Sequence, residues 1–320
     1  MKLNVNGFAR AVVGAGALAA AALLASCGGG SQVETFRPSR VIAFGDEFSV
    51  INPNGSKYTV NALAAGSTTQ FDCGSNPLWI QVLAVGYGLV FPQCPGTGST
   101  VPVSRIYAAN GATVADLTAQ IDDHLNNGGG FANGDLVTVL VGANDVVAQF
   151  QQYPAVGEDQ LAANLAAAGT ALAQQVNRLA GYGAKVLIVT VPDMGLTPFA
   201  GDRSAGSTNS NPALLTRLST QFNDALLAKI LNDGHKIGLV QLDQYLKGAD
   251  TATINGNSGY PYTNTTLVAC AVALPNCSTG TLVPAAASAN WLWADNRHLS
   301  ATGQASLGSL ALSRAQNNPF

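Results

Sequence analysis

Four short polar blocks stand out in this sequence because their residue types could together support hydrolysis. In chain order they are Gly45-Asp46-Glu47, Asn110-Gly111, Asn144-Asp145 and the pair Asp295 and His298. Cleavage of an ester needs a nucleophile, a base within hydrogen-bond reach, a carboxylate that orients the base, and N–H donors for the developing oxyanion. Histidine suits the base because its pKa lies near neutrality. The blocks therefore indicate a candidate site for acyl transfer.

Each block also has an ordinary structural interpretation. Gly111 follows an asparagine and could be a turn glycine, and Asn144-Asp145 could cap a helix. An Asp-x-x-His spacing is common by chance, so His298 could be an exposed loop histidine. The joint order of the blocks along the chain favours one site over four unrelated features.

The other histidines are predicted to be structural. His124 falls within a helical pattern, and His235 follows Asp233-Gly234 in a predicted turn. Trp291 and Trp293 stand just before the last block, where they could line a cleft or pack in the core.

The segments that must position these blocks alternate between strand-like and helix-like patterns. Strand-like segments are 40–44, 105–108, 136–141, 185–191 and 237–241, and helix-like segments are 77–85, 114–125, 158–179, 212–231 and 301–315. The third and fourth strands are continuous apolar runs, which are typical of parallel strands buried on both faces. The sequence thus predicts an α/β fold: one doubly wound, mainly parallel five-stranded sheet with helices on both faces, in three layers.

Two long segments do not fit this sheet-and-helix pattern. Residues 52–75 and 249–290 are rich in Gly, Ser, Thr and Asn. Loops of that length in a compact domain are usually functional or covering elements, and open α/β sheets bind ligands at the carboxyl ends of their strands. We expect both excursions to cover that edge of a single domain spanning residues 40–320.

The N-terminal residues indicate export. Lys2 and Arg10 precede an apolar stretch that is too short for a membrane span and ends in small residues, as in a secretory signal peptide. Its end, Leu24-Ala25-Ser26-Cys27, resembles the lipobox of bacterial lipoproteins, in which cleavage leaves a lipidated cysteine; the alternative is an ordinary signal peptide with an incidental cysteine. We predict a signal peptide over 1–26 and a lipidated tether over 27–39. The protein would be anchored at the cell envelope, at the outer membrane or on the periplasmic face.

Four further cysteines follow, at positions 73, 94, 270 and 277. An even number outside the cytoplasm favours disulfides, and three connectivities are possible. Pairing Cys73 with Cys94 and Cys270 with Cys277 closes the shortest loops, and we expect this pairing.

The four blocks, in this order and spacing, resemble those of the SGNH/GDSL family of esterases and lipases. The resemblance extends over nearly all of residues 40–316 and includes the segment 191–198. It implies an SGNH-hydrolase-like, flavodoxin-like fold and ester hydrolysis. It also implies that His298 is the general base, oriented by Asp295, and that Gly111 and Asn144 supply donors to the oxyanion hole.

The sequence departs from the family pattern at the nucleophile. The family has serine where this chain has Glu47. Ser49 is a poor substitute, because side chains at i and i+2 on a strand-to-helix turn point in different directions. A carboxylate at position 47 could attack the ester, act as a base on water, or fill the oxyanion hole and pair with Asn144 and a protonated His298.

Composition excludes several other functions. The chain has 15 Lys and Arg against 18 Asp and Glu with no basic cluster, which argues against nucleic-acid binding. It has no dinucleotide fingerprint, P-loop or metal-ligand cluster, so we predict no cofactor and no metal. The predicted function is a monomeric hydrolase acting on lipid, glycan or other acyl esters. The alternatives are an impaired esterase that binds a ligand or glycan, and a structural envelope lipoprotein.

Overall fold

The computed structural model describes residues 36–96, 102–201, 211–257, 259–286 and 290–317. The predicted signal peptide 1–26, Cys27 and residues 28–35 of the predicted tether lie outside these ranges. Within the described residues, no helix combines the length and the apolar character needed to cross a bilayer.

A parallel sheet forms the centre of the fold. Its strands are β1 (Arg40–Gly45), β4 (Arg105–Ile106), β5 (Asp135–Leu140), β6 (Lys185–Val189) and β7 (Ile237–Val240). They lie in the order β4-β1-β5-β6-β7, and every neighbouring pair is parallel. All residues of β5 are buried, as expected of an apolar strand covered on both faces. The predicted fold class is confirmed.

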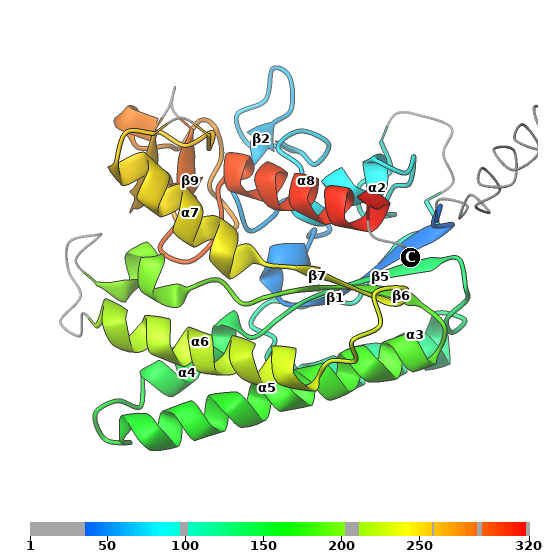
Figure 1. Ribbon diagram of the computed structural model, residues 1–320. Helices are drawn as coiled ribbons and strands as arrows, with labels where there is room; N and C mark the ends of the chain where they lie inside the picture. Colours follow the sequence, from blue (N-terminus) through cyan, green and yellow to red (C-terminus); the bar gives the residue numbers. More distant parts are fainter. Residues whose placement is uncertain (1–35, 97–101, 202–210, 258, 287–289, 318–320) are drawn as a thin grey trace, which may run out of the picture. The chain divides into compact units, whose positions relative to one another are not determined.

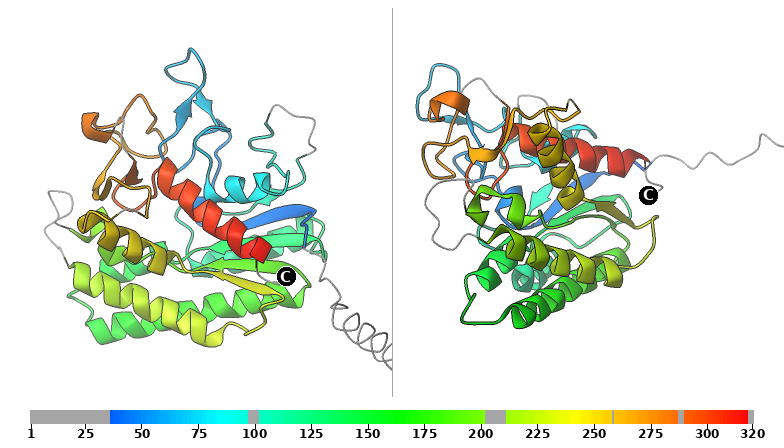
Figure 2. Two further views of the ribbon diagram at one scale, coloured as in Figure 1. Left: turned by 45° about the horizontal axis from the view of Figure 1, so that its top comes forward. Right: turned by 60° about the vertical axis from the view of Figure 1, so that its left-hand side comes forward.

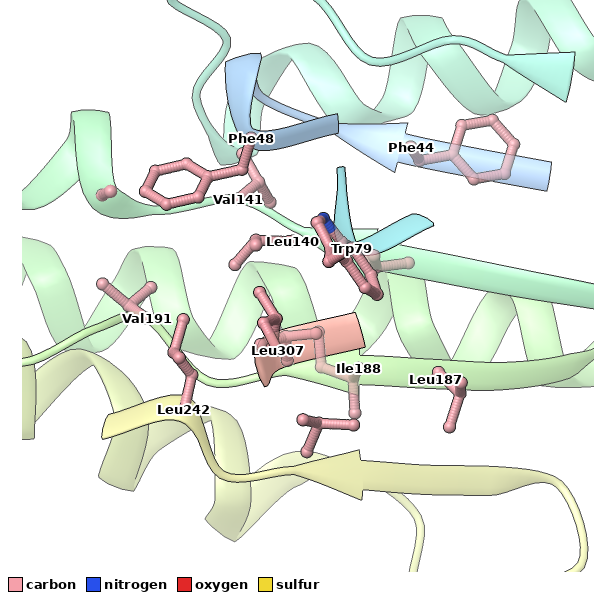
Figure 3. Close-up of a cluster of buried hydrophobic side chains, with 14 of the residues drawn as sticks. Phe44, Phe48, Trp79, Leu140, Val141, Leu187, Ile188, Val191, Leu242 and Leu307 are labelled. Atoms are coloured by element: carbon pink, nitrogen blue, oxygen red, sulfur yellow. The ribbon is translucent and has the colours of Figure 1, made fainter. Parts of the chain in front are cut away.

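Helices cover both faces of this sheet. On one face lie α2 (Trp79–Val85) and α8 (Ala301–Asn317); on the other lie α3 (Leu117–Asn127), α4 (Ala143–Phe150), α5 (Glu158–Gly181) and α6 (Pro212–Lys229) (Figure 1). Both views of Figure 2 keep α8, in red, across the sheet from α5, in green. Trp79 and Leu307 of the first layer lie in one core with Leu140 and Ile188 of the sheet (Figure 3).

Two helices were not predicted from the sequence. α4 begins directly after a glycine at the end of β5, where Asn144-Asp145 indicated only a cap. α7 (Leu242–Ile254) follows β7 after Gln241 alone, and Gln241 makes no side-chain capping hydrogen bond. Neither helix therefore begins with the side-chain capping hydrogen bond that usually marks a helix start.

The excursions contain more regular structure than their composition indicated. Within 52–75, β2 (Ala62–Leu63) and β3 (Phe71–Asp72) form an antiparallel pair. The segment 249–290 begins inside α7 and contains β8 (Asn264–Val268), which pairs with β9 (Trp291–Trp293). The interpretation of this second segment as loop alone was therefore wrong. Short strands there are stabilised by tertiary pairing, which composition does not reveal.

The two excursions are joined to each other. The buried Asn61 side chain donates to the carbonyls of Pro275 and Cys277, at 2.9 Å each. Disulfides link Cys73 to Cys94 and Cys270 to Cys277, so the expected pairing is confirmed. The first disulfide thus ties the end of the first excursion to the segment after α2, and the second closes a short loop inside the second excursion. Asn61 connects the two excursions.

A buried lysine binds the backbone at the C-terminal end of the first excursion. Lys57 is fully buried, and its Nζ donates to the carbonyls of Cys73, Ser75 and Asn76 at 2.8–2.9 Å. Burial lowers the pKa of Lys57 to about 8. Three backbone carbonyls therefore take the place of water around this ammonium group and fix residues 73–76.

A sharp glycine turn joins β5 to α4. Gly142 has φ +124°, which disfavours any residue with a Cβ, and a Cβ there would lie 2.5 Å from Phe222 Cζ and 2.7 Å from Val191 Cγ2. The turn lets α4 begin at the edge of the sheet, so that Asn144 in its first turn stays beside the end of β1.

We expect Gly142→Ala to lower the free energy of unfolding by about 2–4 kcal/mol, because backbone strain and overpacking act together. Chemical denaturation measures this value. Gly181→Ala is the matched control: Gly181 ends α5 with open space around its Cβ position, so alanine should leave stability unchanged or raise it. Equal stability of the two variants would contradict the role of Gly142.

Candidate active site

Four segments converge at the carboxyl edge of the sheet and bring the predicted site residues together. Glu47 opens the short helix η2 (Glu47–Ser49) after β1, where the Asp46 side chain caps the backbone N–H of Phe48 at 3.2 Å. Gly111 lies in the loop after β4, and Asn144 lies in the first turn of α4. Asp295 and His298 lie in the turn between β9 and α8.

The Glu47 carboxylate occupies the donors at the centre of the site. Its Oε2 accepts the backbone N–H of Gly111 at 2.9 Å and the side-chain N–H of Asn144 at 3.0 Å. Its Oε1 lies 3.1 Å from Nε2 of His298. Glu47 is only 4% exposed. The side chain therefore sits where an acyl-transfer site would need open N–H donors.

Asp295 and two aromatic rings fix the imidazole of His298. Its Nδ1 lies 2.8 and 2.9 Å from the two carboxylate oxygens of Asp295. The centroid of its ring lies 5.4 Å from that of Phe48 and 5.9 Å from that of Tyr58. The ring is thus oriented with Nε2 toward Glu47.

The charges of these groups reinforce one another. Burial alone would lower the pKa of His298, but hydrogen bonds and charges of Asp295 and Glu47 outweigh burial and raise this pKa to about 9. Burial would likewise raise the pKa of Glu47, yet His298 and Asn144 hold it at about 2. The pKa of Asp295 is also lowered, because contact with His298 outweighs burial. At neutral pH the site therefore holds an imidazolium between two carboxylates, and an imidazolium cannot act as a general base.

A neighbouring acid secures the loop that carries Gly111. Asp145 Oδ2 accepts the backbone N–H of Val114 at 3.1 Å, while Asn144 Nδ2 also donates to the carbonyl of Ala112 at 3.0 Å. Burial raises the pKa of Asp145 to about 6. Two consecutive residues of α4 thus hold residues 112–114 in place.

Three other residues shape the site, and the sequence analysis assigned them no role in it. Phe48 and Tyr58 have no spacing that would link them to His298 before the chain folds. Asp46 is buried, and within the described residues its Oδ2 has no hydrogen-bond partner. Burial, and then the charge of Glu47, raise the pKa of Asp46 well above its usual range.

The remaining candidates lie outside the site. Ser49 is fully buried, and its Oγ accepts the indole N–H of Trp79 at 3.1 Å, so it faces α2 and cannot replace the nucleophile. His124 contacts the Tyr107 hydroxyl at 3.0 Å and the Gly130 carbonyl at 2.9 Å, as a structural histidine.

The two tryptophans and His235 do not line the site either. Trp293 is fully buried and donates to the carbonyl of Thr265 at 2.8 Å, and Trp291 is 7% exposed, so both pack in the interior. His235 is exposed in its turn. Among the described residues, no group of three or more His, Cys, Asp or Glu side chains could hold a metal ion.

The raised pKa of His298 is open to direct measurement, because the chain has only three histidines to assign by NMR. We expect its imidazole to titrate near pH 9 and to titrate at a lower pH in Glu47→Gln, which removes one negative charge. The titration of His124, bonded to Gly130, serves as the control. Because the folded pKa exceeds the unfolded value, the stabilisation is complete below about pH 6.5 and is lost as the pH rises through 9. Titration of His298 near pH 6.5 in the unaltered protein would contradict this charge state.

Solved structures with a similar fold include three that are related to esterases. An acetyl xylan esterase is 14% identical with a TM-score of 0.45, and covers 86% of this chain and 98% of its own. An acetylxylan esterase from Geobacillus stearothermophilus is 15% identical with a TM-score of 0.39, covering 88% and 96%. A putative GDSL-like lipase from Parabacteroides merdae is 11% identical with a TM-score of 0.45, covering 88% and 98%.

Values this low carry no conclusion about substrate, and no curated protein matches the chain. The model of one family, the GDSL-like lipase/acylhydrolases, does match, over residues 30–310. Since that match spans most of the sequence and the site lies within it, the protein belongs to the GDSL-like lipase/acylhydrolase family.

Proposed function

We propose that this chain carries an acyl-ester site at the bacterial cell envelope that Glu47 holds closed. The chain binds lipid, glycan or other acyl esters and hydrolyses them slowly at neutral pH. Membership of the acylhydrolase family supports the ester chemistry. The observation that carries the proposal is the Glu47 carboxylate bound to the N–H groups of Gly111 and Asn144.

A substrate must compete with Glu47 for these donors. The carbonyl oxygen of an ester reaches Gly111 and Asn144 only when the carboxylate withdraws from both and from His298. A hydrogen bond to a charged group contributes about 1.5–3 kcal/mol, and a neutral ester carbonyl regains only part of it. Ester binding in the reactive position is therefore weak.

The serine mechanism lacks two of its parts in this chain. Position 47 carries no hydroxyl. His298, with its pKa raised to about 9, is protonated at neutral pH and cannot accept a proton from a nucleophile. The position of the imidazole itself is intact, because Asp295 still holds Nδ1. Replacing Glu47 with serine would therefore supply the missing hydroxyl and remove a negative charge that keeps His298 protonated.

A second candidate makes Glu47 itself the nucleophile, and its contact with His298 favours it. The carboxylate would attack the ester carbonyl carbon and form a mixed anhydride, while the alcohol leaves with the proton of the His298 imidazolium. Water, deprotonated by the now neutral His298, would then cleave the anhydride and restore Glu47. The low pKa of Glu47, about 2, makes it a weak nucleophile and disfavours this route.

We expect Glu47→Ser to raise kcat/KM for 4-nitrophenyl acetate and butyrate at least about 100-fold, the scale of general-base catalysis. The change frees the donors, removes a charge that keeps His298 protonated, and supplies a hydroxyl. Adding His298→Ala should abolish the gain. Glu47→Gln is the matched control, because it keeps the donors filled and offers no hydroxyl.

Two results would overturn this account. A folded Glu47→Ser variant without activity would refute the proposal that Glu47 holds an acyl-ester site closed. Hydrolysis by the unaltered chain that depends on His298 and disappears in Glu47→Ser would establish Glu47 as the nucleophile.

Anchoring at the envelope is a separate part of the proposal, and the Leu24-Ala25-Ser26-Cys27 sequence supports it. We expect Cys27→Ser to release the protein into the soluble fraction or to block its processing, because the thiol that would carry the lipid is gone. Membrane fractionation with immunoblotting measures this, and Ser31→Ala in the tether is the control. Unchanged membrane association with normal cleavage would refute lipidation at Cys27.

A further inference from the structure

An arginine next to His298 has no role in the site described so far. The guanidinium carbon of Arg297 lies 5.8 Å from the centroid of the Phe199 ring. Its backbone N–H donates to Asp295 at 2.8 Å. The backbone N–H of Phe199 donates to the carbonyl of Asn296, also at 2.8 Å. Arg297 is therefore held both by the turn that carries His298 and by the aromatic ring beneath it.

Phe199 connects this arginine to α4. It lies in the short helix η5 (Pro198–Ala200), and its ring packs edge-on against Phe150 with a centroid distance of 6.0 Å. Phe150 ends α4, whose first turn carries Asn144. We call Phe150, Phe199 and Arg297 the cationic rim; it joins the segment of Asn144 to the segment of His298.

The guanidinium of Arg297 in the cationic rim has no acidic partner among the described residues. Among the described residues, no carboxylate lies within ion-pair distance of Arg297, and its side-chain nitrogens make no hydrogen bond. The nearest acid along the chain, Asp295, is occupied by His298. A guanidinium stacked on a ring keeps its N–H edge free and pre-oriented for a carboxylate.

We propose that Arg297 recognises a carboxylate on the alcohol part of the ester, so that the substrate class is esters of anionic alcohols or phenols. This inference rests on the proposed function: once Glu47→Ser opens the site, His298 takes the proton of the serine hydroxyl and returns it from Nε2 to the departing alcohol. The alcohol part therefore departs beside His298, and Arg297 precedes His298 in the same turn. A carboxylate at that end of the ligand gains a charge-assisted, two-pronged contact that a neutral ester lacks.

The test compares an anionic and a neutral acetate ester of the same phenol framework: 4-acetoxybenzoate and its methyl ester. In the Glu47→Ser protein, kcat/KM should be higher for the anionic ester, through a lower KM, and this preference should weaken with added salt. Arg297→Gln should reduce the ratio of the two kcat/KM values about tenfold or more, the effect of one charge-assisted hydrogen bond. Arg297→Lys should restore part of it, and Arg314→Gln on α8 is the charge-matched control.

Binding of the products gives a readout that does not need turnover. Calorimetry of 4-hydroxybenzoate and methyl 4-hydroxybenzoate with Glu47→Ser should show the same Arg297-dependent preference. An inactive Glu47→Ser protein that keeps this preference would refute the proposed function and support the cationic rim. A ratio unchanged by Arg297→Gln in both measurements would overturn the rim proposal alone.

Discussion

The contacts of the Glu47 carboxylate link segments of the site that are far apart in the sequence. One side chain at the end of β1 binds the loop after β4, the first turn of α4 and the turn before α8. The same contacts set the charge of the site, because they keep Glu47 ionised and His298 protonated. The position of the Glu47 carboxylate and the protonation of His298 are therefore coupled, and neither changes without the other.

The fold supplies this arrangement through close turns at one edge of the sheet. Gly45 has φ +125°, and a Cβ there would lie 1.9 Å from the carbonyl oxygen of Leu140, so only glycine lets β1 turn so close to β5. Gly142 likewise allows a close turn between β5 and α4. Two adjacent parallel strands thus deliver Glu47 and Asn144 to one point, within hydrogen-bond distance.

The excursions complete the site from the opposite side. Tyr58 of the first excursion lies against the imidazole of His298, while Thr59 donates to the carbonyl of Leu299 at 2.9 Å. Asn61 then joins this excursion to the second one. The expectation that both segments cover the carboxyl edge agrees with these contacts for the first excursion, which reaches His298 directly. The second excursion contributes indirectly, because its carbonyls at Pro275 and Cys277 accept the hydrogen bonds from Asn61 of the first excursion.

Much of this architecture is encoded locally in the sequence. Continuous apolar runs predicted the buried parallel strands, and the blocks around Glu47, Gly111, Asn144 and His298 predicted which residues meet. The bounds of α4 and α7 were not predicted, because the residues that precede them, Gly142 and Gln241, make no side-chain capping hydrogen bond. For Glu47 the sequence left three outcomes open: attack on the ester, activation of water, or filling of the donor pair. Only the tertiary structure shows where the carboxylate lies, on the donor pair and against His298. The physical reason is that a buried carboxylate takes the nearest hydrogen-bond donors, and folding places Gly111, Asn144 and His298 within 3.1 Å of it.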